Sequence, residues 1–144
     1  MNMNNQRQNW LLYVLIFSIA ITSIHYTDNA IFVHDYPEPE WFTTSGVFIT
    51  WVVMTLIGII SYWIYSKQNY WLSYFLLGIY AGTGLSSPAH YFYGALSQFS
   101  FKMHAFIWSD VIAGLSVVGF IIWSGLIAQE WSGTDGNELN NKSI

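Results

Sequence analysis

Histidine and aspartate residues supply most of the chemistry that this sequence offers. Asp28 follows His25 by three residues, His90 stands alone, and Asp110 follows His104 by six residues. Imidazole and carboxylate groups together suit a divalent transition metal such as zinc, iron or copper. The spacing matches no single-helix metal motif. We therefore expect that a metal site would be assembled between segments, from His25, Asp28, His90, His104 and Asp110.

The same residues suit other roles, which the sequence leaves open. Asp110 and His104 are candidates for acid–base catalysis, because two titratable groups in different surroundings can serve as acid and base. Haem held by two histidines on different helices, such as His25 and His90, is a less favoured alternative. A third interpretation is a hydrogen-bonded cluster at a membrane interface that binds nothing.

The composition points to a chain solvated by lipid. Hydrophobic residues make up 53% of the 144 positions and charged residues only 8%, against roughly 25% charged residues in soluble domains. The absence of cysteine excludes disulfides and thiolate metal sites. A net charge of -4 with four lysines and arginines leaves no basic patch for nucleic acid.

Four apolar runs must position the histidines and aspartates. They cover residues 10–24, 42–65, 70–88 and 103–128, and a membrane-spanning helix needs about 20 residues. The first run is long enough only if it continues to Asp28. We predict an all-α, integral membrane four-helix bundle with short connections over residues 10–128. Residues 1–9 form a cytoplasmic N-terminus, and residues 129–144 form a tail expected to be disordered.

The few cations predict an orientation. With four spans, Arg7, Lys67 and Lys142 share one side and Lys102 lies on the other, so the positive-inside rule places both termini in the cytoplasm. All four histidines then fall on the outer side. Asp110 comes six residues after His104, which places it about 9 Å deeper along the helix axis at 1.5 Å per residue. A carboxylate at that depth needs a polar partner.

Two further patterns carry expectations. Pro37 and Pro39 disfavour helix in the first outer loop, so this loop is expected to be extended. Gly78 and Gly82 form a small-xxx-small pair, which favours close helix packing. The pair serves either ordinary packing within the bundle or contact with a second copy or a membrane-complex partner.

In size and helix count the chain is similar to the sterol isomerase and sigma-2-receptor-like membrane family, whose members are compact bundles with acidic and histidine residues inside an aromatic cavity. The similarity concerns architecture and carries over no residue role. We predict a small multi-pass membrane protein whose outer His/Asp cluster binds a metal ion or small ligand. The alternatives are an enzyme acting on a lipid-soluble substrate by proton transfer and an accessory subunit of a larger membrane complex.

Overall fold

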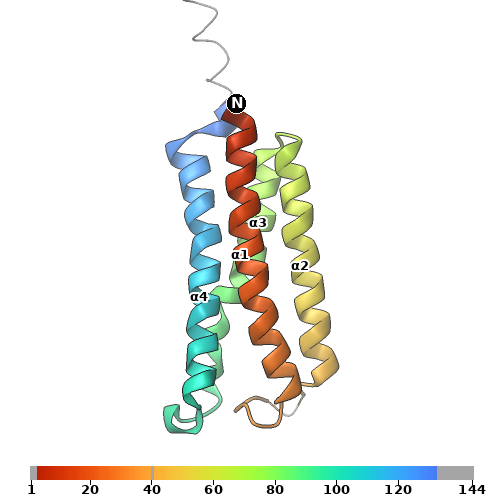
Figure 1. Ribbon diagram of the computed structural model, residues 1–144, viewed down its shortest axis with the longest axis vertical. Helices are drawn as coiled ribbons and strands as arrows, with labels where there is room; N and C mark the ends of the chain where they lie inside the picture. The colour runs from red at the N-terminus through yellow and green to blue at the C-terminus, as the bar shows by residue number, and fades with distance from the viewer. Residues whose placement is uncertain (1–2, 40, 133–144) are drawn as a thin grey trace, which may run out of the picture.

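The computed structural model describes residues 3–39 and 41–132, and within these ranges the chain is helical with no strand. Four α-helices account for most of it: α1 (Met3–Ile31), α2 (Thr44–Ser66), α3 (Tyr70–Leu85) and α4 (Phe101–Ile122). They lie side by side, each running opposite to the one before it, and α1 begins at the end where α4 finishes (Figure 1). The predicted all-α class is confirmed.

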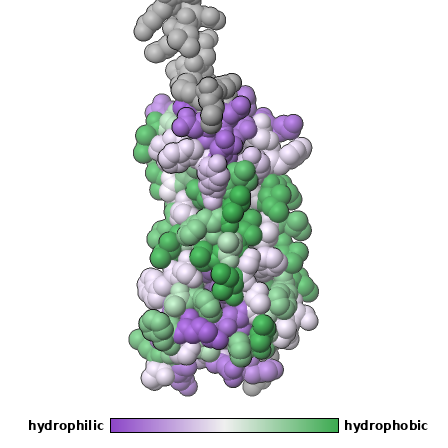
Figure 2. Space-filling view, in the orientation of Figure 1, coloured by the Kyte–Doolittle hydropathy of each residue, from purple (hydrophilic) through white to green (hydrophobic). Residues whose placement is uncertain are grey.

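The four helices form a ring in which each contacts two neighbours. Helix α1 packs against α2 and α4, and α3 packs against the same two helices. Each helix therefore keeps one outward face. On the side of the molecule seen in Figure 2, the surface is mostly hydrophobic in the middle, with hydrophilic residues gathered towards the two ends. Three segments are long and apolar enough to cross a membrane: Asn5–Ile31, Thr44–Ser66 and Phe101–Ile127.

Helix α3 is shorter than the third apolar run predicted. Its α-helical part has 16 residues and ends at Leu85, after which the chain tightens into the 3₁₀-helix η1 (Ser87–Phe92). Pro88 stands at the start of η1, where the missing N–H costs little. With rises of about 1.5 Å and 2.0 Å per residue, α3 accounts for about 24 Å and η1 for about 12 Å of helix length, against the roughly 30 Å hydrocarbon core of a bilayer.

Two glycines allow α3 and α4 to approach closely. A Cβ atom at Gly84 would lie 2.4 Å from the carbonyl oxygen of Asp110, and one at Gly114 would lie 2.9 Å from the carbonyl oxygen of Ala81. At Gly78 and Gly82 a Cβ atom would meet nothing within 4 Å among the described residues. Close packing inside the bundle therefore depends on Gly84 and Gly114, and the predicted Gly78–Gly82 pair lies on an exposed face.

The interior is polar towards both ends and apolar between them. Leu11 and Leu15 of α1, Leu77 of α3 and Val117 of α4 are buried in one hydrophobic cluster. We call these four residues the apolar layer. On α1 it separates Arg7 from the polar residues that begin at Ser18.

The end of α4 folds back onto the bundle. The helix passes into a π-helical turn, η3 (Trp123–Ile127), then reverses at Gln129, whose φ of 48° is left-handed, into η4 (Glu130–Ser132). Glu130 accepts hydrogen bonds from Tyr65 and Ser124 and lies 3.3 Å from Arg7. Residues 130–132, which the sequence analysis assigned to the tail, thus form the helical turn η4, while residues 133–144 lie outside the described residues.

Candidate functional site

A histidine of α1 and an aspartate of α4 meet in the core near the end of the bundle opposite to Arg7. His25 Nδ1 lies 2.7 Å from Asp110 Oδ2, and the two side chains are 3% and 0% exposed. His25 belongs to a buried polar row on α1 that also holds Ser18, Thr22 and Asn29. Residues three or four apart share one helix face, so this row points into the bundle along its length.

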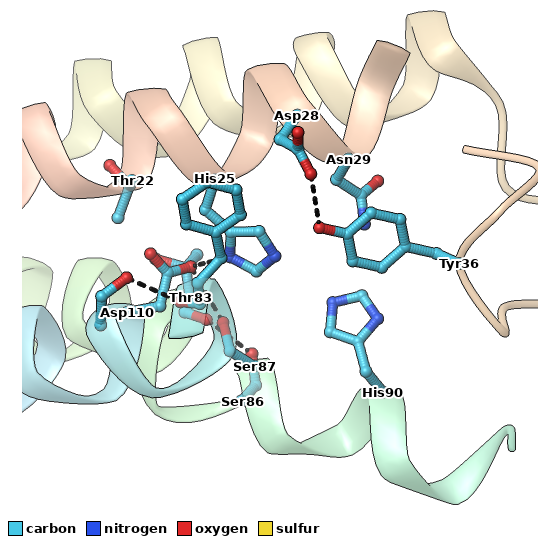
Figure 3. A network of polar contacts seen from close by, with 12 residues as sticks. Thr22, His25, Asp28, Asn29, Tyr36, Thr83, Ser86, Ser87, His90 and Asp110 are labelled. Carbon is cyan, nitrogen blue, oxygen red and sulfur yellow. Dashed lines mark hydrogen bonds and ion pairs between the residues drawn. The ribbon is translucent and has the colours of Figure 1, made fainter. Parts of the chain in front are cut away.

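Asp110 has a second partner in the connection after α3. Ser87 donates a hydrogen bond of 2.9 Å to Asp110 Oδ2, so α1, η1 and α4 are joined at one carboxylate oxygen (Figure 3). The other oxygen, Oδ1, is buried without a hydrogen-bond partner in the described ranges. The expectation that Asp110 needs a polar partner is met by His25 and Ser87.

A second histidine and carboxylate pair lies beside the first. The ring of His90 in η1 lies 5.8 Å from that of His25, centroid to centroid, and its Nδ1 lies 3.0 Å from Glu38 Oε1. Asn29 Nδ2 donates a 2.5 Å hydrogen bond to the same oxygen. The side chain of Glu38 is only 2% exposed, although it belongs to a loop.

The loop between α1 and α2 brings Glu38 into the interior. As predicted, Pro37 to Pro39 form no helix, while Glu40 lies outside the described residues. Tyr36 is buried, and its hydroxyl donates a 2.9 Å hydrogen bond to Asp28. Burial, reinforced by this bond to a carboxylate, raises the pKa of Tyr36 well above its usual value. The loop is therefore fixed against the bundle.

Two of the five predicted metal ligands lie elsewhere. Asp28 accepts a 2.7 Å hydrogen bond from Lys102, and His104 Nδ1 lies 2.7 Å from the hydroxyl of Tyr91. Within residues 3–39 and 41–132, no group of three histidines and carboxylates could hold a metal ion. The metal prediction gains no support from this arrangement, and His104 is not the partner of Asp110.

A cavity of about 480 Å³ adjoins the two histidines. It lies between the ends of α1 and α3, η1, the start of α2 and the first loop. Between Thr44 and Gly58 only Val47 of α2 is buried, whereas at Gly58 an added Cβ would be 3.3 Å from the Tyr80 ring. The lining residues are His25, Tyr26, Asn29, Glu38, Trp41, Phe42, Thr43, Gly46, Val47, Thr50, Met54, Thr83, Ser86, Ser87, Ala89, His90 and Tyr93.

Two residues of this site, Asn29 and Glu38, were not predicted from the sequence. Asn29 follows His25 by four positions, so its place on the buried face of α1 has a signal in the 3–4 spacing of polar residues. Glu38 has no such signal, since only the folded loop places it between Asn29 and His90. Compared with protein-family models, curated proteins and solved structures, the chain shows no match.

Proposed function

We propose that this chain is a multi-pass membrane protein in which α1, α2, α4 and the combined α3–η1 segment cross the bilayer. Large apolar side chains on every helix face outward in support of this: Ile16, Ile59, Phe75 and Ile112 are each more than half exposed. In water such a surface would be costly, whereas lipid accommodates it. Arg7 and Lys67 lie at one end and Lys102 at the other, which favours cytoplasmic termini.

We further propose that the protein binds a small amphipathic molecule in the outer cavity. One observation carries this proposal: a cavity of about 480 Å³ is lined both by aromatic side chains and by His25, the histidine of the buried histidine–aspartate pair. Ligand sites in proteins are typically concavities of about 300–1,000 Å³ with mostly apolar walls and a few placed polar groups. Purely structural packing would not require such a space beside buried charged residues.

Photolabelling in lipid nanodiscs tests this binding function. A ten-carbon alcohol carrying a diazirine in its chain should label peptides that contain cavity residues more than the lipid-facing peptide around Leu115. Thr50→Trp places a large ring in the cavity and should abolish the excess labelling. Ile49→Trp is the matched control. Ile49 is next to Thr50 in the sequence, but its side chain is 63% exposed and does not line the cavity. Equal labelling of all three proteins would refute the proposal.

Proton transfer is a second candidate function, and the geometry of His25 favours it. When Nδ1 carries the ring proton it donates to Asp110, which leaves Nε2 to take up a proton from a substrate. Nε2 has no hydrogen-bond partner within the described ranges, and His25 borders the cavity. A carboxylate that fixes the tautomer of a catalytic histidine is a recurring arrangement in enzymes.

Deuterium uptake tests this candidate without knowledge of the product. Lipid-soluble ketones incubated with the wild-type protein in D₂O should gain deuterium next to the carbonyl group faster than without protein. His25→Gln should abolish the acceleration, and His104→Gln should retain it, because His104 is bonded to Tyr91 outside the cavity. Uptake that is unaffected by His25→Gln would exclude His25 as the base.

A further inference from the structure

One part of the cavity wall carries a buried carboxylate, Glu38. The Glu38 side chain is 2% exposed. Asn29 Nδ2 and His90 Nδ1 both contact the same carboxylate oxygen, Oε1. Its other oxygen, Oε2, is buried without a donor in the described part of the chain. An unpaired oxygen on a buried carboxylate is costly, because it has lost water without gaining a hydrogen bond.

Further unsatisfied acceptors lie next to Glu38. Asn29 Oδ1 is likewise buried and has no donor among the described residues, and His25 Nε2 is an acceptor whenever Nδ1 donates to Asp110. All three residues border the same cavity. The wall of the cavity therefore has an excess of hydrogen-bond acceptors over donors in this region, which favours a ligand that brings several N–H donors.

The protein provides little positive charge at this place. None of the described residues that line the cavity is a lysine or an arginine. Lys102 is bonded to Asp28, and Arg7 is paired with Glu130 at the other end of the bundle. Among the described residues, the basic groups in contact with Glu38 and Asp110 are His90 and His25, so no lysine or arginine competes with a cationic ligand at Glu38.

The rest of the lining suits an organic cation better than a metal ion. Tyr26, Trp41, Phe42 and Tyr93 contribute aromatic rings to the cavity, and such rings attract ammonium groups through their π faces. The described residues hold no group of three histidines and carboxylates fit for a metal ion. A volume of about 480 Å³ also exceeds by far what a bare ion needs.

From these observations we infer that the ligand of the outer cavity is an amphipathic organic amine, whose ammonium group binds at Glu38 and Asn29 and whose apolar part lies along the aromatic wall. This inference rests on the proposed ligand-binding function and names the chemical class that it serves.

Three photoreactive ten-carbon probes that differ only in the head group test the inference: a primary amine, an alcohol and a carboxylate. Labelling of the cavity is measured in nanodiscs relative to the lipid-facing peptide around Leu115, which corrects for partition into lipid. We expect the amine to reach half-maximal labelling at a concentration at least about tenfold below that of the alcohol, with the carboxylate weakest.

The matched variants separate the head-group site from the cavity itself. Glu38→Gln should remove the preference for the amine while the alcohol still labels, and Glu130→Gln, which alters the other buried glutamate, should retain the preference. Equal labelling by amine and alcohol in the wild-type protein, or stronger labelling by the carboxylate, would overturn the amine inference and leave ligand binding standing. Labelling of the cavity by none of the probes would overturn both.

Discussion

His25 and Asp110 are 85 positions apart in the sequence, yet a 2.7 Å contact between Nδ1 and Oδ2 joins α1 to α4 deep in the bundle. Neither side chain is more than 3% exposed. Removal of one partner leaves a buried polar group unpaired, whereas replacement of both with apolar groups removes the problem altogether. This difference makes the pair open to direct test.

Asp110→Ala should lower the free energy of unfolding by about 3–5 kcal/mol, since His25 and Ser87 both lose their partner. The double variant His25→Phe/Asp110→Leu should recover most of this loss. Lys102→Gln is a control, because its pair with Asp28 is partly exposed and worth about 1 kcal/mol or less. Unfolding by SDS titration of purified protein measures all three. If the double variant is no more stable than Asp110→Ala, the His25–Asp110 pair contributes stability that apolar packing cannot replace.

Glycine substitutions should separate the close α3–α4 contact from the exposed face of α3. Gly84→Ala would place Cβ 2.4 Å from a backbone oxygen, so we expect a loss of at least about 2 kcal/mol as the helices are forced apart. Gly78→Ala and Gly82→Ala meet no such obstacle and should be neutral or stabilising by up to about 1 kcal/mol, from higher helix propensity.

The same glycine variants address the predicted dimer face. The oligomeric state of Gly78→Ala and Gly82→Ala in mild detergent should be compared with that of the wild-type protein. A shift from dimer to monomer, together with a loss of stability, would show that the exposed pair is covered by another copy. Unchanged behaviour would leave Gly84 and Gly114 as the glycines that matter for packing.

Glu130 should be essential for fixing the end of the chain to the bundle. Glu130→Ala removes the acceptor for Tyr65 and Ser124 and the partner of Arg7, and should cost about 3–5 kcal/mol of stability. Glu130→Gln keeps an acceptor and should cost less. Limited proteolysis should show faster cleavage after Ala128 in the alanine variant. Equal cleavage of the wild-type and alanine proteins would contradict this role.

Tyr36 should make the protein sensitive to alkali. Burial and the bond to Asp28 raise the pKa of Tyr36 in the folded protein, so its contribution to stability is complete below about pH 10, the usual tyrosine pKa, and declines as the pH rises above it. Tyr36→Phe cannot ionise. The stability difference between wild type and variant should therefore shrink between pH 9 and 11 in unfolding titrations. A constant difference over this range would refute the argument.

Much of the fold was readable from hydropathy, because apolar runs of spanning length leave few alternatives to helix. The histidines at one end of the bundle also follow from the order of the helices alone. Hydropathy did not indicate that α1 begins as early as Met3. It also did not indicate that the chain turns back at Gln129 into η4. These two chain ends meet through the contact of Arg7 with Glu130, and both lie in segments whose composition is hydrophilic.

The site was predictable only in part. Asp110 demanded a partner by its depth, and His25 was among the candidates that depth allowed. His104, which the sequence offered together with Asp110 as a candidate for acid–base catalysis, lies against Tyr91 instead. Glu38 could not have been found, since a residue between two prolines has no periodicity that would reveal its burial.

The apolar layer of Leu11, Leu15, Leu77 and Val117 has an electrical consequence for a protein that spans a membrane. A dry layer of this kind takes up most of a transmembrane voltage, about 2.3 kcal/mol per elementary charge per 100 mV across the whole membrane. His25 and Asp110 lie on the side of the layer opposite to Arg7. In the proposed membrane protein, most of the voltage would therefore fall between Arg7 and the His25–Asp110 pair.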